Sequence, residues 1–186
     1  MANTARRNDP ADSDWFNNPA GFQVNHKYGF GMVDAKAAVI SAKTWTNLPP
    51  RAMHLSPVLN SNLDIFDNGI PRTSTISVPA GTGITKVEFV RVRINTQPSS
   101  PRGCSWAWKN LEIKLTSPSG TTSLLAGAVA NNYVGPGEYV DFAFGAVRFM
   151  GENPDLEFSR EAKAPGRRGR RSKQQIAAAG AHGPRT

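Results

Sequence analysis

The stretch LEIKLTSPSGTTSLLA, residues 111–126, decides the fold class of this chain. In its first half, Leu111, Ile113 and Leu115 alternate with polar residues, which is the two-residue period of a half-buried β-strand. The following Ser-Pro-Ser-Gly-Thr segment, residues 117–121, has the composition of a tight turn, and residues 122–126 return to strand-forming side chains. The stretch therefore predicts a β-hairpin.

Further strand-like segments lie on both sides of this hairpin. Residues 72–78 are rich in Thr and Ser, and residues 139–144 and 147–149 contain aromatic and β-branched side chains. The 186 residues include 17 Gly and 14 Pro, which favours short strands joined by turns. We expect a mainly β fold of about six to eight strands, arranged as a β-sandwich.

The segment 84–95 changes phase in its middle. Val87 and Phe89 share one side of the alternation, whereas Val90, Val92 and Ile94 share the other. A change of phase within one strand predicts a β-bulge or a change of partner strand at that point.

One helix is predicted, from the N-cap Asp34 to about Trp45. Alanines and Val39 recur on it at three- and four-residue intervals and make an apolar stripe that needs a partner surface. The Leu48-Pro49-Pro50 sequence ends the helix. We interpret residues 1–25 as an irregular segment, and residues 51–72 as a linker followed by one or two strands.

The charge is uneven along the chain. The formal net charge is +8, and the segment from Ser159 to the C-terminus holds eight basic residues and one acid, 8 − 1 = +7, which leaves +1 for the rest. After about Asp155 the apolar pattern is lost, so we predict a disordered basic tail. No stretch approaches the roughly 18 apolar residues of a membrane-spanning helix, and the polar N-terminus does not resemble a signal peptide.

Two ordered sets of motifs carry a family resemblance. The run from Asp14-Trp15 through VNHKYGFGMVDA, residues 24–35, to Trp45 resembles the end of the catalytic domain of kexin/furin-like proprotein convertases. Residues 75–79, 84–88 and 111–126 resemble the strands of that family's P (Homo B) domain. Residues 141–144 and Gly151-Glu152 are a weaker match to its aromatic strand and W-G-E segment.

This resemblance implies a domain order and an activity. Residues 1–50 would be the C-terminal remnant of a subtilisin-like peptidase domain, residues 51–156 a C-terminally incomplete P domain with a jelly-roll-like sandwich, and residues 157–186 the basic disordered tail. The parent enzyme would be a calcium-dependent serine endopeptidase of the secretory pathway that processes precursor proteins after paired basic residues. The missing catalytic domain would be the partner of this chain.

The sequence also departs from the family pattern. The catalytic Asp, His and Ser motifs cannot be mapped onto it, so the chain alone is expected to be inactive. The family's R-G-D-L segment is replaced by residues 102–111, and the basic tail stands where the last strands of the P domain are expected. An alternative reading is a non-catalytic sandwich whose basic tail binds anionic partners, with nucleic acid disfavoured because the globular part is nearly neutral.

No residue is assigned a catalytic, cofactor or metal role. We expect His26 to be a structural hydrogen-bonding residue, because no histidine lies in a recognisable catalytic motif. The carboxylates at 9, 12 and 14 lack the ligand order of an EF-hand. We expect Trp106 and Trp108 to be buried, because aromatic side chains contribute most of the core area. We expect the arginine pairs at 167–168 and 170–171 to lie in a solvated tail, with polyanion binding or dibasic cleavage as alternatives. The weighed residues are His26, His54, His182, Asp9, Asp12, Asp14, Cys104, Trp106, Trp108, Arg167, Arg168, Arg170 and Arg171.

Overall fold

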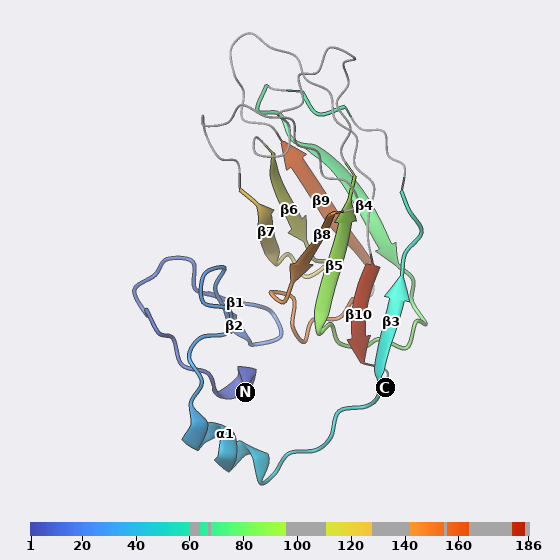
Figure 1. Cartoon of the computed structure of the whole chain (residues 1–186). Helices are drawn as coiled ribbons and strands as arrows, with labels where there is room; N and C mark the ends of the chain where they lie inside the picture. Colours follow the sequence, from blue (N-terminus) through green and yellow to red (C-terminus); the bar gives the residue numbers. More distant parts are fainter. Residues whose placement is uncertain are drawn as a thin grey trace.

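The computed structural model describes residues 1–59, 64–66, 68–95, 111–127, 142–154, 156–163 and 180–184. An N-terminal segment contains one short 3-10 helix, one two-stranded sheet and one α-helix, and the remaining strands form a sandwich (Figure 1). The elements are η1 (Ala2–Thr4), β1 (Phe16–Asn17), β2 (Gln23–Val24), α1 (Ala35–Ala42), β3 (Arg51–Leu55), β4 (Arg72–Val78), β5 (Phe89–Ile94), β6 (Glu112–Thr116), β7 (Thr122–Ala126), β8 (Phe142–Ala146), β9 (Leu156–Lys163) and β10 (Gly180–Pro184).

Two four-stranded antiparallel sheets make up the sandwich. The first has the strand order β3-β10-β5-β8 and the second β4-β9-β6-β7. The predicted hairpin is confirmed, because β6 and β7 pair around the turn at 117–121. The mainly β class and the sandwich are likewise confirmed.

The core lies between the two sheets. It is made of side chains that alternate inward along the strands, as in β5, where Val90, Val92 and Ile94 are buried and the residues between them are exposed. Phe149 and Phe158 meet edge to face in this core, with ring centroids 5.5 Å apart. Burial of such apolar surface is the main stabilising term of a sandwich.

Of the two alternatives predicted for 84–95, the bulge is wrong and the change of partner is confirmed. β5 begins only at Phe89, and its register with β8 is continuous. Val87 precedes the strand and is buried. Its N–H donates to the Glu152 carbonyl (2.8 Å), and its carbonyl accepts from the Gly151 N–H (2.7 Å). The change of phase therefore marks the point where the chain leaves Gly151-Glu152 and begins to pair with β8 and β10. A register shift does occur in β6, between Ile113 and Lys114.

Two predictions for the C-terminal third are also wrong. Residues 147–149 form a turn instead of a strand, with Phe149 fully buried. The expected disorder after residue 156 is contradicted by β9, which lies between β4 and β6, and by β10, which lies between β3 and β5. Strands thus occupy the place where the last strands of the sandwich were expected to be missing. Residues 164–179 lie outside the described residues.

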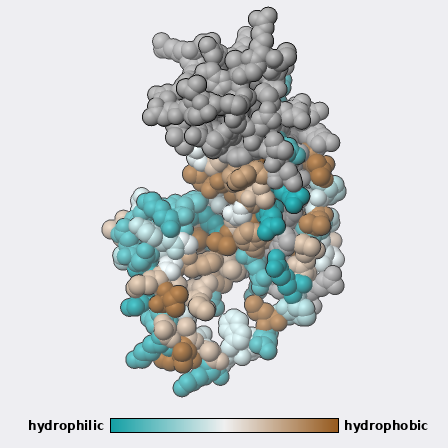
Figure 2. All heavy atoms as spheres, in the orientation of Figure 1, coloured by the Kyte–Doolittle hydropathy of each residue, from teal (hydrophilic) through white to brown (hydrophobic). Residues whose placement is uncertain are grey.

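α1 lies apart from both sheets (Figure 1). The Asp34 carboxylate accepts from the Ala37 N–H at 2.9 Å, which confirms the predicted N-cap, although the helix ends three residues before Trp45. No helix residue is buried, and Val39, Ile40 and Trp45 are 63%, 56% and 53% exposed. Hydrophobic side chains are visible at this end of the molecule (Figure 2). Among the described residues, no helix is long and apolar enough to span a bilayer.

Candidate functional site

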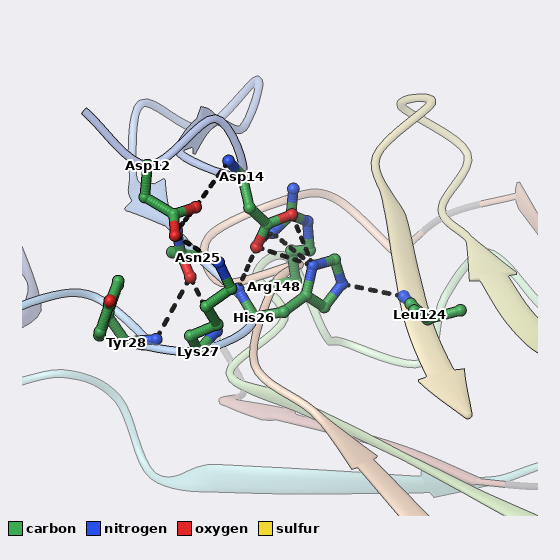
Figure 3. A network of polar contacts seen from close by, with 8 residues as sticks. All are labelled: Asp12, Asp14, Asn25, His26, Lys27, Tyr28, Leu124 and Arg148. Atoms are coloured by element: carbon green, nitrogen blue, oxygen red, sulfur yellow. Dashed lines mark hydrogen bonds and ion pairs between the residues drawn. The ribbon is translucent and has the colours of Figure 1, made fainter. Parts of the chain in front are cut away.

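The best-defined polar cluster joins the N-terminal segment to the sandwich, and we call it the joint (Figure 3). Its members contact one another across the two parts of the chain and come from sequence positions about a hundred residues apart. They are Asp14, Asn18, Phe22 and His26 on the N-terminal side, and Leu124, Arg148, Met150 and Gly151 on the sandwich side.

Asp12 organises the loop that carries the N-terminal half of the joint. Its carboxylate accepts from the Asp14 N–H (2.9 Å) and the Asn25 side-chain amide (3.1 Å), and it pairs with the Lys27 ammonium. The hydrogen bond from Lys27, followed by that from the Asp14 N–H, lowers the pKa of Asp12 to about 2. The carboxylate is therefore ionised at neutral pH and holds three segments of the loop together.

The turn at 25–31 fixes the position of His26. Asn25 is buried, and its side-chain oxygen accepts from the N–H groups of Lys27 (2.7 Å) and Tyr28 (3.3 Å). Gly31 has a φ of 108°, and a Cβ there would collide with the Arg6 carbonyl oxygen. Glycine is required at this place because the backbone approaches so closely.

His26 uses both ring nitrogens in the joint. Its Nδ1 lies 2.9 Å and 3.0 Å from the two Asp14 oxygens, and its Nε2 accepts from the Leu124 N–H of β7 at 2.9 Å. These partners assign the proton to Nδ1, so the ring donates to Asp14 and accepts from Leu124. The residue that we expected to be a structural hydrogen-bonding group thus tethers the N-terminal segment to an edge strand.

Arg148 closes the cluster from the sandwich side. Its guanidinium lies 3.8 Å from an Asp14 oxygen and 5.2 Å from the centre of the Phe16 ring. Burial lowers the pKa of Arg148, and the Asp14 charge opposes this shift. Burial would also raise the pKa of Asp14, but the hydrogen bonds from His26 outweigh it and hold that pKa below its usual value.

The Asn18 side chain uses both its amide nitrogen and its oxygen in the contact between the two parts. It is 3% exposed, and its side-chain amide donates to the carbonyls of Arg148 (3.1 Å) and Met150 (2.9 Å). Its side-chain oxygen accepts from the Phe22 N–H at 2.9 Å. Since every one of these groups would cost free energy if buried without a partner, Asn18 fixes the geometry of the joint.

Gly151 allows the two backbones to come close. Its φ is 79°, and a Cβ there would lie 2.7 Å from the Phe22 ring and 3.0 Å from the Ala20 side chain. The next residue, Glu152, is buried, and one of its carboxylate oxygens accepts from the Thr121 hydroxyl at 2.5 Å. The Gly-Glu pair singled out in the sequence therefore links the joint to the hairpin β6–β7.

The other candidate residues that the structure describes lie elsewhere in the chain. His54 lies in β3 and His182 in β10. Asp9 uses its backbone carbonyl to accept from the Trp15 indole at 2.6 Å. In the part of the chain that the structure describes, no three His, Cys, Asp or Glu side chains are placed to hold a metal ion. Cys104, Trp106, Trp108, Arg167, Arg168, Arg170 and Arg171 lie outside the described residues.

Sequence reasoning missed Asn18 and Arg148 as members of the joint. Asn18 is followed by a proline in a loop, which predicts only a turn, and Arg148 stands in a segment that the pattern assigned to a strand. Their contact joins positions 130 residues apart, so no local pattern could have identified it.

Comparison with solved structures identifies the fold. A serine protease of Aeromonas sobria superposes on 91% of this chain, with a TM-score of 0.72 and 21% identity, and this chain covers 33% of it. The same protease in complex with its chaperone gives a TM-score of 0.70. No family model matches the sequence. The architecture is therefore that of part of a serine protease chain.

Sequence relatives narrow this class. Human proprotein convertase subtilisin/kexin type 7 is 34% identical over 155 residues, which is 80% of this chain, and human furin is 32% identical over 147 residues, or 78% of it. The chain belongs to the kexin/furin-like proprotein convertase family, as its motifs predicted. It spans 18% of the length of either relative.

Proposed function

We propose that this chain contributes the end of the peptidase domain and the P domain of a kexin/furin-like endopeptidase, and that the sandwich stabilises the peptidase domain through the joint. Asn18 carries this proposal, because one buried side chain bonds to both parts of the chain. A rigid joint of this kind transmits the stability of the sandwich to the segment that precedes it.

The uncovered helix supports the same proposal. The exposed side chains of Val39, Ile40 and Trp45 form an apolar surface of the kind that usually packs against another part of a protein. The relatives are more than five times as long as the matched region, so their remaining residues could supply the covering surface. In our proposal the rest of the peptidase domain packs on α1.

The whole enzyme would process precursor proteins after paired basic residues, with calcium, in the secretory pathway. These properties rest on the family resemblance. The Asp14–His26 pair has two elements of a catalytic triad, but the Nε2 atom accepts from the Leu124 amide instead of a serine hydroxyl. We therefore expect the purified chain to leave an Arg-Xaa-Lys-Arg peptide uncleaved at every calcium concentration. Turnover by pure protein would contradict this expectation.

A chimaera tests the stabilising role. The matched region of human furin is replaced by this chain, and secreted protein and cleavage of a paired-basic peptide are measured. We expect an active chimaera. Asn18→Ala, which strands two carbonyls in the joint, should cost about 2 kcal/mol and reduce the secreted folded protein severalfold. Lys86→Ser, at an exposed position whose side chain is not a member of the joint, is the matched control. A chimaera secreted no better than furin without this region would refute the proposal.

A further inference from the structure

One hydrogen bond ties the N-terminal segment to the last strand of a sheet. β7 ends the sheet β4-β9-β6-β7, and among the described strands it pairs only with β6. Its Leu124 N–H instead donates to Nε2 of His26 at 2.9 Å (Figure 3). A backbone group of an edge strand, which would otherwise be open to another chain, is thus held by a titratable side chain.

This hydrogen bond requires a neutral imidazole. Nε2 can accept only through a free lone pair, so the single ring proton is on Nδ1, which lies 2.9 Å and 3.0 Å from the two Asp14 oxygens. A second proton would bind to Nε2 and face the Leu124 N–H. The bond to Leu124 would then be lost, whereas the bond to Asp14 would remain and become charge-assisted.

Charged groups of both signs surround the ring. The Asp14 carboxylate favours a charged His26, whereas the Arg148 Nη1, which lies 3.4 Å from Nδ1, opposes it. The ring therefore has an acidic neighbour to hold when charged and a backbone donor to hold when neutral. The charged groups on the elements packed around it are Asp12, Asp14 and Lys27 of the loop, Arg148 of the turn after β8, and Glu112 and Lys114 of β6.

The carboxyl groups of this set keep their charge in the range where a histidine changes its own. A hydrogen bond from a neighbouring lysine lowers the pKa of Asp12 to about 2, and hydrogen bonds from two lysines lower the pKa of Glu112. Burial would raise the pKa of Asp14, but the bonds from His26 hold it below its usual value. Histidine is the side chain that ordinarily titrates between about pH 5 and about pH 8. A change of the joint within that range is therefore assigned to His26.

We propose that His26 is an acid-sensitive tether between the N-terminal segment and the sandwich. When neutral, it holds β7 through Leu124; when protonated, it releases β7 and stays bonded to Asp14. The bonds from the Asn18 side chain to two carbonyls contain no titratable group, so the joint loosens on the β7 side only. The tether rests on the proposed function, because it regulates the contact through which the sandwich stabilises the segment before it.

Hydrogen exchange of the full chain tests the tether. Nuclear magnetic resonance follows the Leu124 amide, and its protection factor is taken relative to an unstructured peptide at the same pH. We expect this factor to fall about tenfold from about pH 7.5 to about pH 5.5, because the hydrogen bond is lost. The ring protons of His26 should titrate with the same midpoint, and the Val92 amide of β5 should stay protected. An unchanged Leu124 factor, or an equal loss at Val92, would overturn the proposal.

Three variants identify the group that responds to acid. His26→Gln places an amide oxygen near the position of Nε2, so Leu124 should stay protected at both pH values. His26→Ala offers no acceptor, so Leu124 should exchange rapidly at both. His54→Gln removes a histidine of β3 and is the matched control, which should keep the wild-type dependence on pH. Far-ultraviolet circular dichroism establishes that each variant is folded. A loss of protection in His26→Gln equal to that of the wild type would assign the change to another group and overturn the proposal.

The furin chimaera separates this tether from the stabilising role of the sandwich. A failed chimaera together with acid-sensitive protection of Leu124 would refute the stabilising role and support the tether. An active chimaera together with protection that does not depend on pH would refute the acid response of His26 alone.

Discussion

The two sheets of the sandwich share one core but differ in how they hold charge. On the sheet β4-β9-β6-β7, the Glu112 carboxylate lies 2.8 Å from the Lys114 ammonium and 2.9 Å from that of Lys163. The sheet β3-β10-β5-β8 has arginines and no acid. Opposite charges paired within a sheet partly cancel, whereas strands that hold only basic residues give a sheet one sign of charge. The two sheets therefore differ in the balance of charge along their strands.

The interiors of the two sheets differ in the opposite sense. The inward residues of β5 are all apolar. In β9, by contrast, the inward position between Phe158 and Ala162 is occupied by Arg160, which is 2% exposed. Its guanidinium donates to the Ser74 hydroxyl at 2.5 Å, and its Nη1 has no partner within the described residues. The sheet with paired surface charges thus contains a costly buried one.

The largest effect is expected from Phe158→Ala, which tests whether β9 is part of the paired sheet's core. Phe158 is buried and packs against Phe149, so its truncation should reduce the free energy of unfolding by about 3–5 kcal/mol. Urea denaturation followed by circular dichroism measures the change. Leu124→Ala, at a 40% exposed position of β7, is the control and should cost far less. Equal effects would mean that β9 does not hold the sheet together.

The same strand shows where sequence reasoning stopped. The hairpin 111–126 and the N-cap Asp34 were predictable because their signals are local. β9 lies in the segment that was predicted to be disordered because the apolar pattern is lost after about Asp155. In the structure Arg160 takes the inward position between Phe158 and Ala162. The partner strand of β9, β4, lies 78 to 90 residues upstream, beyond the reach of any local pattern.

The joint was only half predictable for a related reason. The segment that contains His26 was recognised as a motif of the family resemblance, and His26 was expected to make structural hydrogen bonds. Its partner Leu124 lies 98 residues away, and Arg148, which contacts the same Asp14 carboxylate, lies 122 residues away. Only the folded chain brings the edge of β7 and the turn after β8 next to this loop.

A smaller effect, and of opposite sign, is expected for Arg160→Leu combined with Ser74→Ala. Burial lowers the pKa of Arg160 to about 10, so the folded state disfavours the charged form, and this cost is relieved only as the pH rises past about 10. Replacing the pair by apolar side chains should raise the free energy of unfolding at pH 7 by about 1–3 kcal/mol. Urea denaturation at pH 7 measures it.

Arg91→Leu is the matched control for that comparison. It makes the same substitution on the acid-free sheet at an exposed position, where a change of less than about 0.5 kcal/mol is expected. If the double variant with Arg160→Leu were instead destabilised, the Arg160 guanidinium of the wild type would have to be paired. The interior of its sheet would then not contain a costly buried charge.

The smallest effect is expected from Glu112→Gln, measured as a function of pH. Hydrogen bonds from Lys114 and then Lys163 hold the pKa of Glu112 below its usual value. A carboxyl whose pKa is lower in the folded state contributes stability above its unfolded pKa, and this contribution is lost as the pH falls through the folded value. The wild type should therefore lose more stability than the variant between about pH 5 and about pH 3. Added salt should reduce the difference, because the three groups lie at the surface. Parallel curves of stability against pH for the two proteins would show that these ion pairs do not stabilise the sheet β4-β9-β6-β7. The difference in charge between the two sheets would then have no consequence for stability at Glu112.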